Sequence, residues 1–106
     1  MFKLVARPEF THTVAVMVPI DGGHREESFT ARFRLTEDED ARVDTFDGTV
    51  TWLREIIISL GDLVDEAGKA IPYSDEVRDR VLALPYARIA LARTYFAAVG
   101  KARLGN

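Results

Sequence analysis

The amino-acid sequence predicts an α+β fold: an N-terminal antiparallel β-hairpin, about residues 12–35, packed on a small bundle of about four helices within about residues 36–103. Two patterns predict this architecture. Apolar and polar residues alternate in the first third of the chain, whereas later the apolar residues recur at helical spacing behind capping residues. With 106 residues, 47% of them hydrophobic, the chain can bury one core but not two, so residues 1–106 are expected to form a single domain.

The hairpin is predicted from two strand-like segments and a glycine turn. Residues 13–20 are β-branched or apolar, and residues 27–36 alternate, with one face formed by Phe29, Ala31, Phe33 and Leu35. Between them, Asp21-Gly22-Gly23 supplies residues that tolerate positive φ. Pro19 is expected at a strand end or on an edge strand. Because a two-stranded ribbon is marginal in water, helices are expected to cover its apolar face.

Two helices are predicted after the hairpin. Thr36 and Glu39 fit a capping box, and the acids around them suit the positive end of a helix, so this acidic run needs no metal. A second helix is predicted over about residues 48–60, apolar around most of its circumference. Helical spacing places Ile58 on its polar stripe, so Ile58 is a candidate partner-binding residue. The alternative is a single exposed or oligomer-covered isoleucine with no specific role.

A turn and two more helices are predicted in the remaining chain. The sequence Asp65-Glu66-Ala67-Gly68 predicts a short second hairpin or turn near residues 62–72. Ser74 is expected to cap a third helix, with acids in its first turn. Pro85 is expected to open the last helix, where proline is favoured.

The last helix is expected to have a core-facing stripe and an outward flank. One stripe is expected to face the core rather than to form a ligand groove; it consists of Ile89, Ala92, Phe96 and Val99, with Arg88, Leu91 and Tyr95 beside it. The opposite flank combines Tyr86 and Arg93 with Ala90 and Ala97, a mix that suits close contact with a partner. Tyr86 and Arg93 are therefore candidate partner-binding residues, unless this flank is a plain solvated face.

Charge and composition exclude several classes of protein. The net charge is −3, so the uniform basic surface that nucleic acid requires is absent, and no nucleic-acid partner is expected. No apolar run approaches the ~20 residues needed to span a bilayer, and the first residues lack the apolar core of a secretory signal. We therefore expect an unprocessed protein of the cytoplasm, without a membrane partner. The lack of cysteine excludes disulfides and thiolate metal sites.

The sequence contains no recognisable catalytic, cofactor or metal site. His12 and His24 stand without a serine or aspartate at nucleophile spacing. The acids from Asp62 to Glu66 superficially suggest a calcium loop, but Tyr73 occupies the position that requires a bidentate glutamate. No glycine-rich segment continues into the Gly-Lys-Ser/Thr of a phosphate-binding loop. The protein is therefore expected not to be an enzyme and to use no cofactor.

The charge is unevenly distributed along the chain. Residues 37–66 contain ten acids and two bases, whereas residues 80–106 contain five bases and no acid. Attraction between these parts would favour packing the last helix near the middle ones, or head-to-tail contacts in a homo-oligomer. The alternative is two solvated faces that never meet.

The order of features along the chain resembles that of the tail assembly chaperones of long-tailed bacteriophages, prophages and gene-transfer particles. The residues that carry the resemblance are Met1-Phe2-Lys3-Leu4-Val5, Phe29-Thr30-Ala31-Arg32-Phe33-Arg34, Trp52-Leu53-Arg54-Glu55, Leu60-Gly61, Asp65-Glu66-Ala67-Gly68, Pro72-Tyr73-Ser74, Leu84-Pro85-Tyr86, Tyr95-Phe96 and Gly105-Asn106. One position departs from the pattern, because Asp62 follows the glycine where such proteins often carry an aromatic residue.

The resemblance implies a non-enzymatic assembly factor. Such proteins look like small α+β units that bind the tape measure protein, keep it soluble, help to recruit tail tube subunits and are absent from the mature particle. It also implies the cytoplasm of the bacterial host as the place of action. The alternative is a minor virion component or a small regulatory protein-interaction module, and a tape measure gene directly downstream would favour the chaperone.

Overall fold

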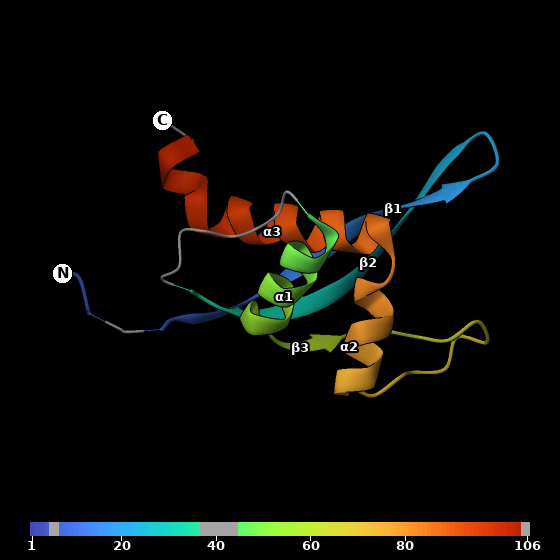
Figure 1. The fold of residues 1–106 in the computed structure, drawn as a ribbon, viewed down its shortest axis with the longest axis horizontal. Helices are drawn as coiled ribbons and strands as arrows, with labels where there is room; N and C mark the ends of the chain where they lie inside the picture. Colours follow the sequence, from blue (N-terminus) through green and yellow to red (C-terminus); the bar gives the residue numbers. More distant parts are fainter. Residues whose placement is uncertain (5–6, 37–44, 105–106) are drawn as a thin grey trace.

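A computed structural model describes residues 1–4, 7–36 and 45–104 of the chain, with only the backbone of residues 101–104. The elements follow one another as β1 (Glu9–Ile20), β2 (Gly23–Arg34), α1 (Phe46–Ile56), β3 (Ile57–Gly61), α2 (Asp75–Leu82) and α3 (Pro85–Leu104). The strands form one antiparallel sheet, and α1 and α3 cover one of its faces (Figure 1). The α+β class is therefore confirmed.

The predicted N-terminal hairpin is present and longer than expected. Strands β1 and β2 pair from Glu9↔Arg34 to Ile20↔Gly23 without interruption. The turn passes through Gly22, whose φ of 79° is readily available only to glycine. Strand β1 lies at the edge of the sheet, which explains how Pro19, one residue before its end, is tolerated.

The core lies between this sheet and the helices. Val14 and Val16 of β1 are buried. Phe29, Ala31 and Phe33 of β2 are buried too, which confirms the alternation predicted for residues 27–36. From α3, the ring of Tyr95 packs edge-on against Phe33, and its hydroxyl accepts a hydrogen bond from the Thr36 amide at 3.2 Å. The helices thus supply the cover that a two-stranded ribbon needs.

The second predicted helix is wrong in its last turn. Helix α1 ends at Ile56, and Ile57–Gly61 is instead the third strand, paired with β2. Three consecutive isoleucines favour the pleated conformation because their branched Cβ atoms restrict helical rotamers. At the start of helix α1, the Thr45 hydroxyl accepts a hydrogen bond from the Gly48 amide at 3.0 Å.

Three helices are found in the described part of the chain, where about four are predicted. The missing one is the helix predicted at the Thr36 capping box, most of which falls on residues 37–44, outside the described residues. Helices α2 and α3 begin as predicted: the Ser74 hydroxyl accepts a hydrogen bond from the Val77 amide at 3.1 Å, and α3 opens at Pro85.

The face of α3 that was assigned to the core is wrong in part, because Leu91 and Tyr95, expected beside the stripe, are buried and Ala92 is half-buried against the core. Ile89, Phe96 and Val99 are exposed. The buried residues of α3 are Ala87, Ala90, Leu91 and Tyr95, so Ala90 of the predicted outer flank belongs to the core. Apolar residues surround this helix, and spacing alone therefore does not select its inner face. Helix α3 packs against β1, and the small side chains of its buried Ala87 and Ala90 suit close packing.

Candidate protein-binding surfaces

The first candidate surface is the outside of α3. Ile89, Phe96 and Val99 are 57%, 41% and 46% exposed, and with the half-buried Ala92 they form one stripe at helical spacing, here called the outer stripe. At one side of the stripe, the Arg88 guanidinium lies 4.5 Å from the centre of the Phe46 ring, which is 58% exposed. This contact ties the start of α1 to α3 and extends the apolar surface.

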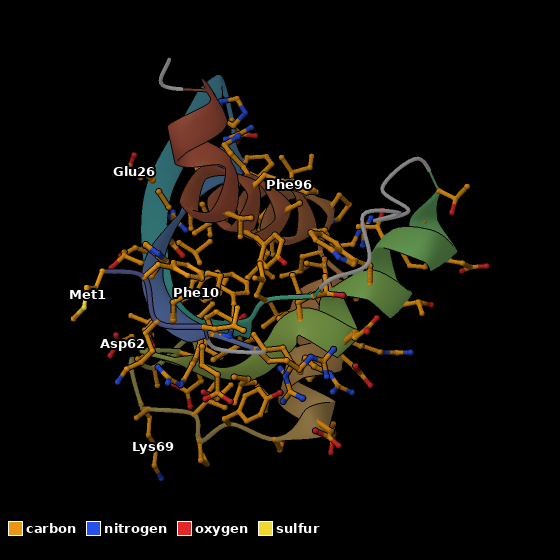
Figure 2. The ribbon with its side chains drawn as sticks, turned by 90° about the vertical axis from the view of Figure 1, so that its left-hand side faces the viewer. Met1, Phe10, Glu26, Asp62, Lys69 and Phe96 are labelled. Carbon is orange, nitrogen blue, oxygen red and sulfur yellow. The ribbon has the colours of Figure 1, made fainter. Side chains whose placement is uncertain are left out.

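Aromatic packing supports the outer stripe from below. Phe96, labelled on α3 in Figure 2, stacks on Trp52 with ring centroids 5.1 Å apart. Trp52 in turn packs edge-on against Tyr95, 5.2 Å between centroids. The stripe therefore stands on a rigid aromatic layer rather than on flexible side chains.

The second candidate surface is a groove of about 650 Å³. It lies between the outer half of the β1–β2 hairpin, the segment of residues 62–71, α2 and the corner between α2 and α3. Its apolar lining consists of Val16, Val18, Phe29, Leu63, Val64, Ile71, Val77, Val81, Ala83, Leu84, Tyr86 and Ala87. This size falls within the ~300–1,000 Å³ range of ligand-binding pockets.

One wall of the groove is the predicted small hairpin, which is confirmed. Val64 and Ala70 form a bridge, and the Asp65 carboxylate accepts hydrogen bonds from the amides of Ala67 and Lys69, both at 2.9 Å. Gly68 supplies the positive φ, 82°, that the turn requires. These local bonds hold the wall in place although most of it is exposed.

Another wall of the groove is an unpaired strand edge. Strand β2 pairs with β1 along its whole length but with β3 only from Thr30 to Phe33. The chain leaves the sheet after Gly61, because Asp62 adopts a left-handed conformation with φ 57°. Residues 23–29 of β2 therefore have no neighbouring strand on that side among the described residues, and Arg25, Glu27, Ser28 and Phe29 line the groove.

The rim of the groove carries both signs of charge. Arg25 and Glu27 form an ion pair at 2.7 Å. Asp62 and Arg80 also line the groove, and neither has an ion-pair partner within the described ranges. The rim can thus accept one further cation at Asp62 and one further anion at Arg80.

An ion-pair cluster holds α2, which lines the groove, against α1. Asp79 is bonded to Arg78 and to Arg54 of α1, each at 3.1 Å. The hydrogen bond from Arg78, helped by Arg54, lowers the pKa of Asp79 below its ordinary value of 3.8. The cluster is partly exposed, so it orients the helices more than it stabilises them.

The three predicted partner-binding residues do not share one surface. Tyr86 lines the groove. Arg93 is exposed on α3, and one helical turn after Ile89 it lies beside the outer stripe rather than opposite it as expected. The helical argument for Ile58 is wrong, because Ile58 is half-buried in β3. The pairing advances from Arg32↔Ser59 to Phe33↔Ile57, so Ile58 is the extra residue of a β-bulge.

Sequence reasoning missed most of both surfaces. Ile89, Phe96 and Val99 of the outer stripe were assigned to the core, but they are exposed. The available signal was that α3 is apolar on more than one side, which indicates that a second face needs cover. The groove combines residues from five separate segments of the chain, so no local sequence pattern predicts it.

Within the part of the chain that the structure describes, no group of three or more histidine, aspartate or glutamate residues could hold a metal ion. Over the same residues, no helix is both long enough and apolar enough to cross a membrane. Comparisons with protein families, with curated proteins and with solved structures find no match to this chain.

Proposed function

We propose that this protein is a tail assembly chaperone that binds an apolar helix of a tape measure protein along the outer stripe. It would keep the tape measure protein soluble in the cytoplasm of the bacterial host, help to recruit tail tube subunits and leave before the particle matures. The observation that carries the proposal is the exposure of Ile89, Phe96 and Val99 on one face of α3, while the opposite face of the helix is already buried. The order of sequence features described above is the second support.

The outer stripe has suitable chemistry for a helical partner. Full burial of a large apolar side chain contributes roughly 1.5–3 kcal/mol, so three half-exposed side chains offer a few kcal/mol before the cost of association. Ala92 leaves room for close approach of a second helix, whose axis would run about 8–10 Å from that of α3. The stripe therefore favours a reversible complex, as a chaperone requires.

The positive charge of Arg93, beside the outer stripe, favours a helix that carries an acidic residue. Arg93 is exposed and forms no ion pair with any described residue, whereas Arg88 is held by the Leu82 carbonyl at 2.7 Å and by the Phe46 ring. The bound helix is therefore expected to place an acidic residue next to Arg93.

The proposal is tested by co-expression with a tape measure protein, which the proposal expects to be encoded directly downstream. Pull-down and the soluble fraction of the tape measure protein are the two readouts. The wild-type chain should solubilise and retain it, and Phe96→Asp or Ile89→Asp should abolish both effects. Val64→Asp is the matched control, because Val64 is a similarly exposed apolar residue that lines the groove and not the stripe.

The opposite result has a clear meaning. If the folded wild-type protein neither binds nor solubilises the tape measure protein, the chaperone proposal fails. Immunoblotting of purified particles then separates the alternatives, because a minor virion component would remain in the particle and a regulatory module would not.

A further inference from the structure

Residues 1–4 form an exposed apolar segment at one end of the molecule. Phe2 and Leu4 are 87% and 88% exposed, more than any other large apolar side chain of the described residues apart from Met1. Figure 2 shows Met1 pointing away from the body of the protein. Burial of such an apolar segment against another surface is favourable, because it removes apolar area from water.

The groove lies at the opposite end of the molecule. In Figure 1, the chain starts at one end of the long axis, and the tip of the β1–β2 hairpin and the 62–71 hairpin project at the other end. The molecule extends 47 Å along its longest principal axis. Because the segment of residues 1–4 is this exposed and leaves from the far end, it does not fill the groove of its own chain.

The unpaired edge of β2 gives the groove a preference for an extended occupant. Every second residue of an antiparallel strand directs its N–H and C=O groups to the same neighbour. Over residues 23–29, the groups that point away from β1 have no strand to bind within the described chain. An added strand would form hydrogen bonds with these groups. It would lie beside β2 in the position that β3 would occupy if it continued beyond Gly61.

The side chains of residues 1–4 match this site. In an extended strand, Phe2 and Leu4 point to one side and Lys3 to the other. The apolar pair can therefore enter the lining around Leu84 and Tyr86, while Lys3 faces the solvent side of the rim. There Asp62 lacks an ion-pair partner among the described residues and can accept the ammonium group.

We propose that residues 1–4 of one copy of this protein bind as an added strand in the groove of a second copy. The contact joins two different surfaces, so each copy keeps one free segment and one free groove. Such heterologous contacts propagate head to tail into rings or open filaments. This inference does not depend on the tape measure protein, because the outer stripe takes no part in it.

The absence of cysteine from the chain permits a direct test by cross-linking. A chain with Leu4→Cys and Leu84→Cys should form a ladder of disulfide-linked oligomers under mild oxidation, because one cysteine lies in the segment and the other in the groove. Leu4→Cys with Thr51→Cys is the control, since Thr51 is an exposed residue of α1 outside the groove. Equal ladders in both chains, or none in either, would overturn the proposal.

Mixing two blocked variants tests the direction of assembly. The wild-type chain should exceed its monomer mass of 11.9 kDa in sedimentation, increasingly so at higher concentration. Phe2→Asp with Leu4→Asp removes the apolar side chains of the segment, and Val64→Asp introduces a charge into the groove. Each variant alone should be monomeric at concentrations at least about tenfold above those at which the wild type associates. Circular dichroism verifies that both variants are folded.

The mixture should form a 1:1 dimer and nothing larger, because it contains one functional segment and one functional groove. A wild-type chain that stays monomeric, variants that still associate, or a mixture that remains monomeric while the wild type associates would each contradict the head-to-tail contact.

Discussion

The indole ring of Trp52 stacks on the phenyl ring of Phe96 with 5.1 Å between centroids and 12° between ring planes. This pair connects the buried core of α1 with the exposed stripe of α3, since Trp52 is 5% and Phe96 41% exposed. Trp52 is also the only tryptophan of the chain. A partner that covers the outer stripe must therefore change the surroundings of the single indole.

Binding of an apolar helix should alter the fluorescence of Trp52, and Phe96→Ala should weaken that binding about tenfold to a hundredfold, the usual effect of removing a central aromatic anchor. Titration with a tape measure peptide, followed by tryptophan emission, measures both effects. Ile20→Ala is the matched control, because Ile20 is a similarly exposed apolar residue at the end of β1 and should leave the affinity unchanged. Equal affinities for Phe96→Ala and wild type would remove the stripe from the binding site.

The hydroxyl of Tyr95 is expected to stabilise the fold. It accepts the Thr36 amide at 3.2 Å and is carried by a buried ring, so Tyr95→Phe should lower the free energy of unfolding by about 1 kcal/mol. For a domain of this size the midpoint temperature should fall by about 4–8 °C. Tyr86→Phe removes a hydroxyl that makes no hydrogen bond with the described residues, and its midpoint should stay within about 1 °C of wild type.

Gly61 is expected to be required at the end of β3. A Cβ atom at this position would lie 2.7 Å from the Thr30 hydroxyl oxygen of the paired strand. Gly61→Ala should therefore destabilise the protein by about 1–3 kcal/mol. The double variant with Thr30→Ala should recover most of the loss, and chemical denaturation of the four chains gives the coupling energy. A purely additive result would show that the close approach is not the cause.

Acid should weaken the link between α1 and α2. Because the pKa of Asp79 is lowered, the stabilisation from its bonds to Arg78 and Arg54 is complete above the ordinary carboxyl pKa of 3.8 and is lost as the pH falls through the lowered value. Asp79→Asn should have a lower midpoint temperature than wild type at neutral pH. The gap should close only below pH 3.8. A gap that is independent of pH would instead indicate a steric effect of the substitution.

The hairpin, the turn and the starts of α2 and α3 were predictable because local chemistry determines them. Gly22 permits the turn, Ser74 caps α2, and Pro85 suits the first position of α3. Each of these residues acts on its own backbone or on the next few residues, so the sequence carries the whole cause.

Strand β3 and the inner face of α3 were not predictable in the same way. The run from Ile56 to Ile58 is apolar at both helical and strand spacing. Helix α1 ends at Ile56, and the strand begins at Ile57, where the edge of β2 pairs with it. Ala90 is buried and Ile89 exposed, and which of the two faces the core depends on how α3 packs on the sheet, a property of the whole fold. The groove is bounded by residues that follow the end of β3 and by the start of α3, so its shape also depends on the whole fold.

A single backbone torsion, at Asp62, decides how far the third strand runs. With φ of 57° there, the chain turns out of the sheet after the pair Thr30↔Gly61. A β-branched residue avoids this conformation and would favour continuing alongside β2. Asp62→Val would then let β3 continue along the free edge of β2 and cover the site of the proposed added strand. The length of this one strand would thus decide whether the protein exists as single molecules or as a polymer.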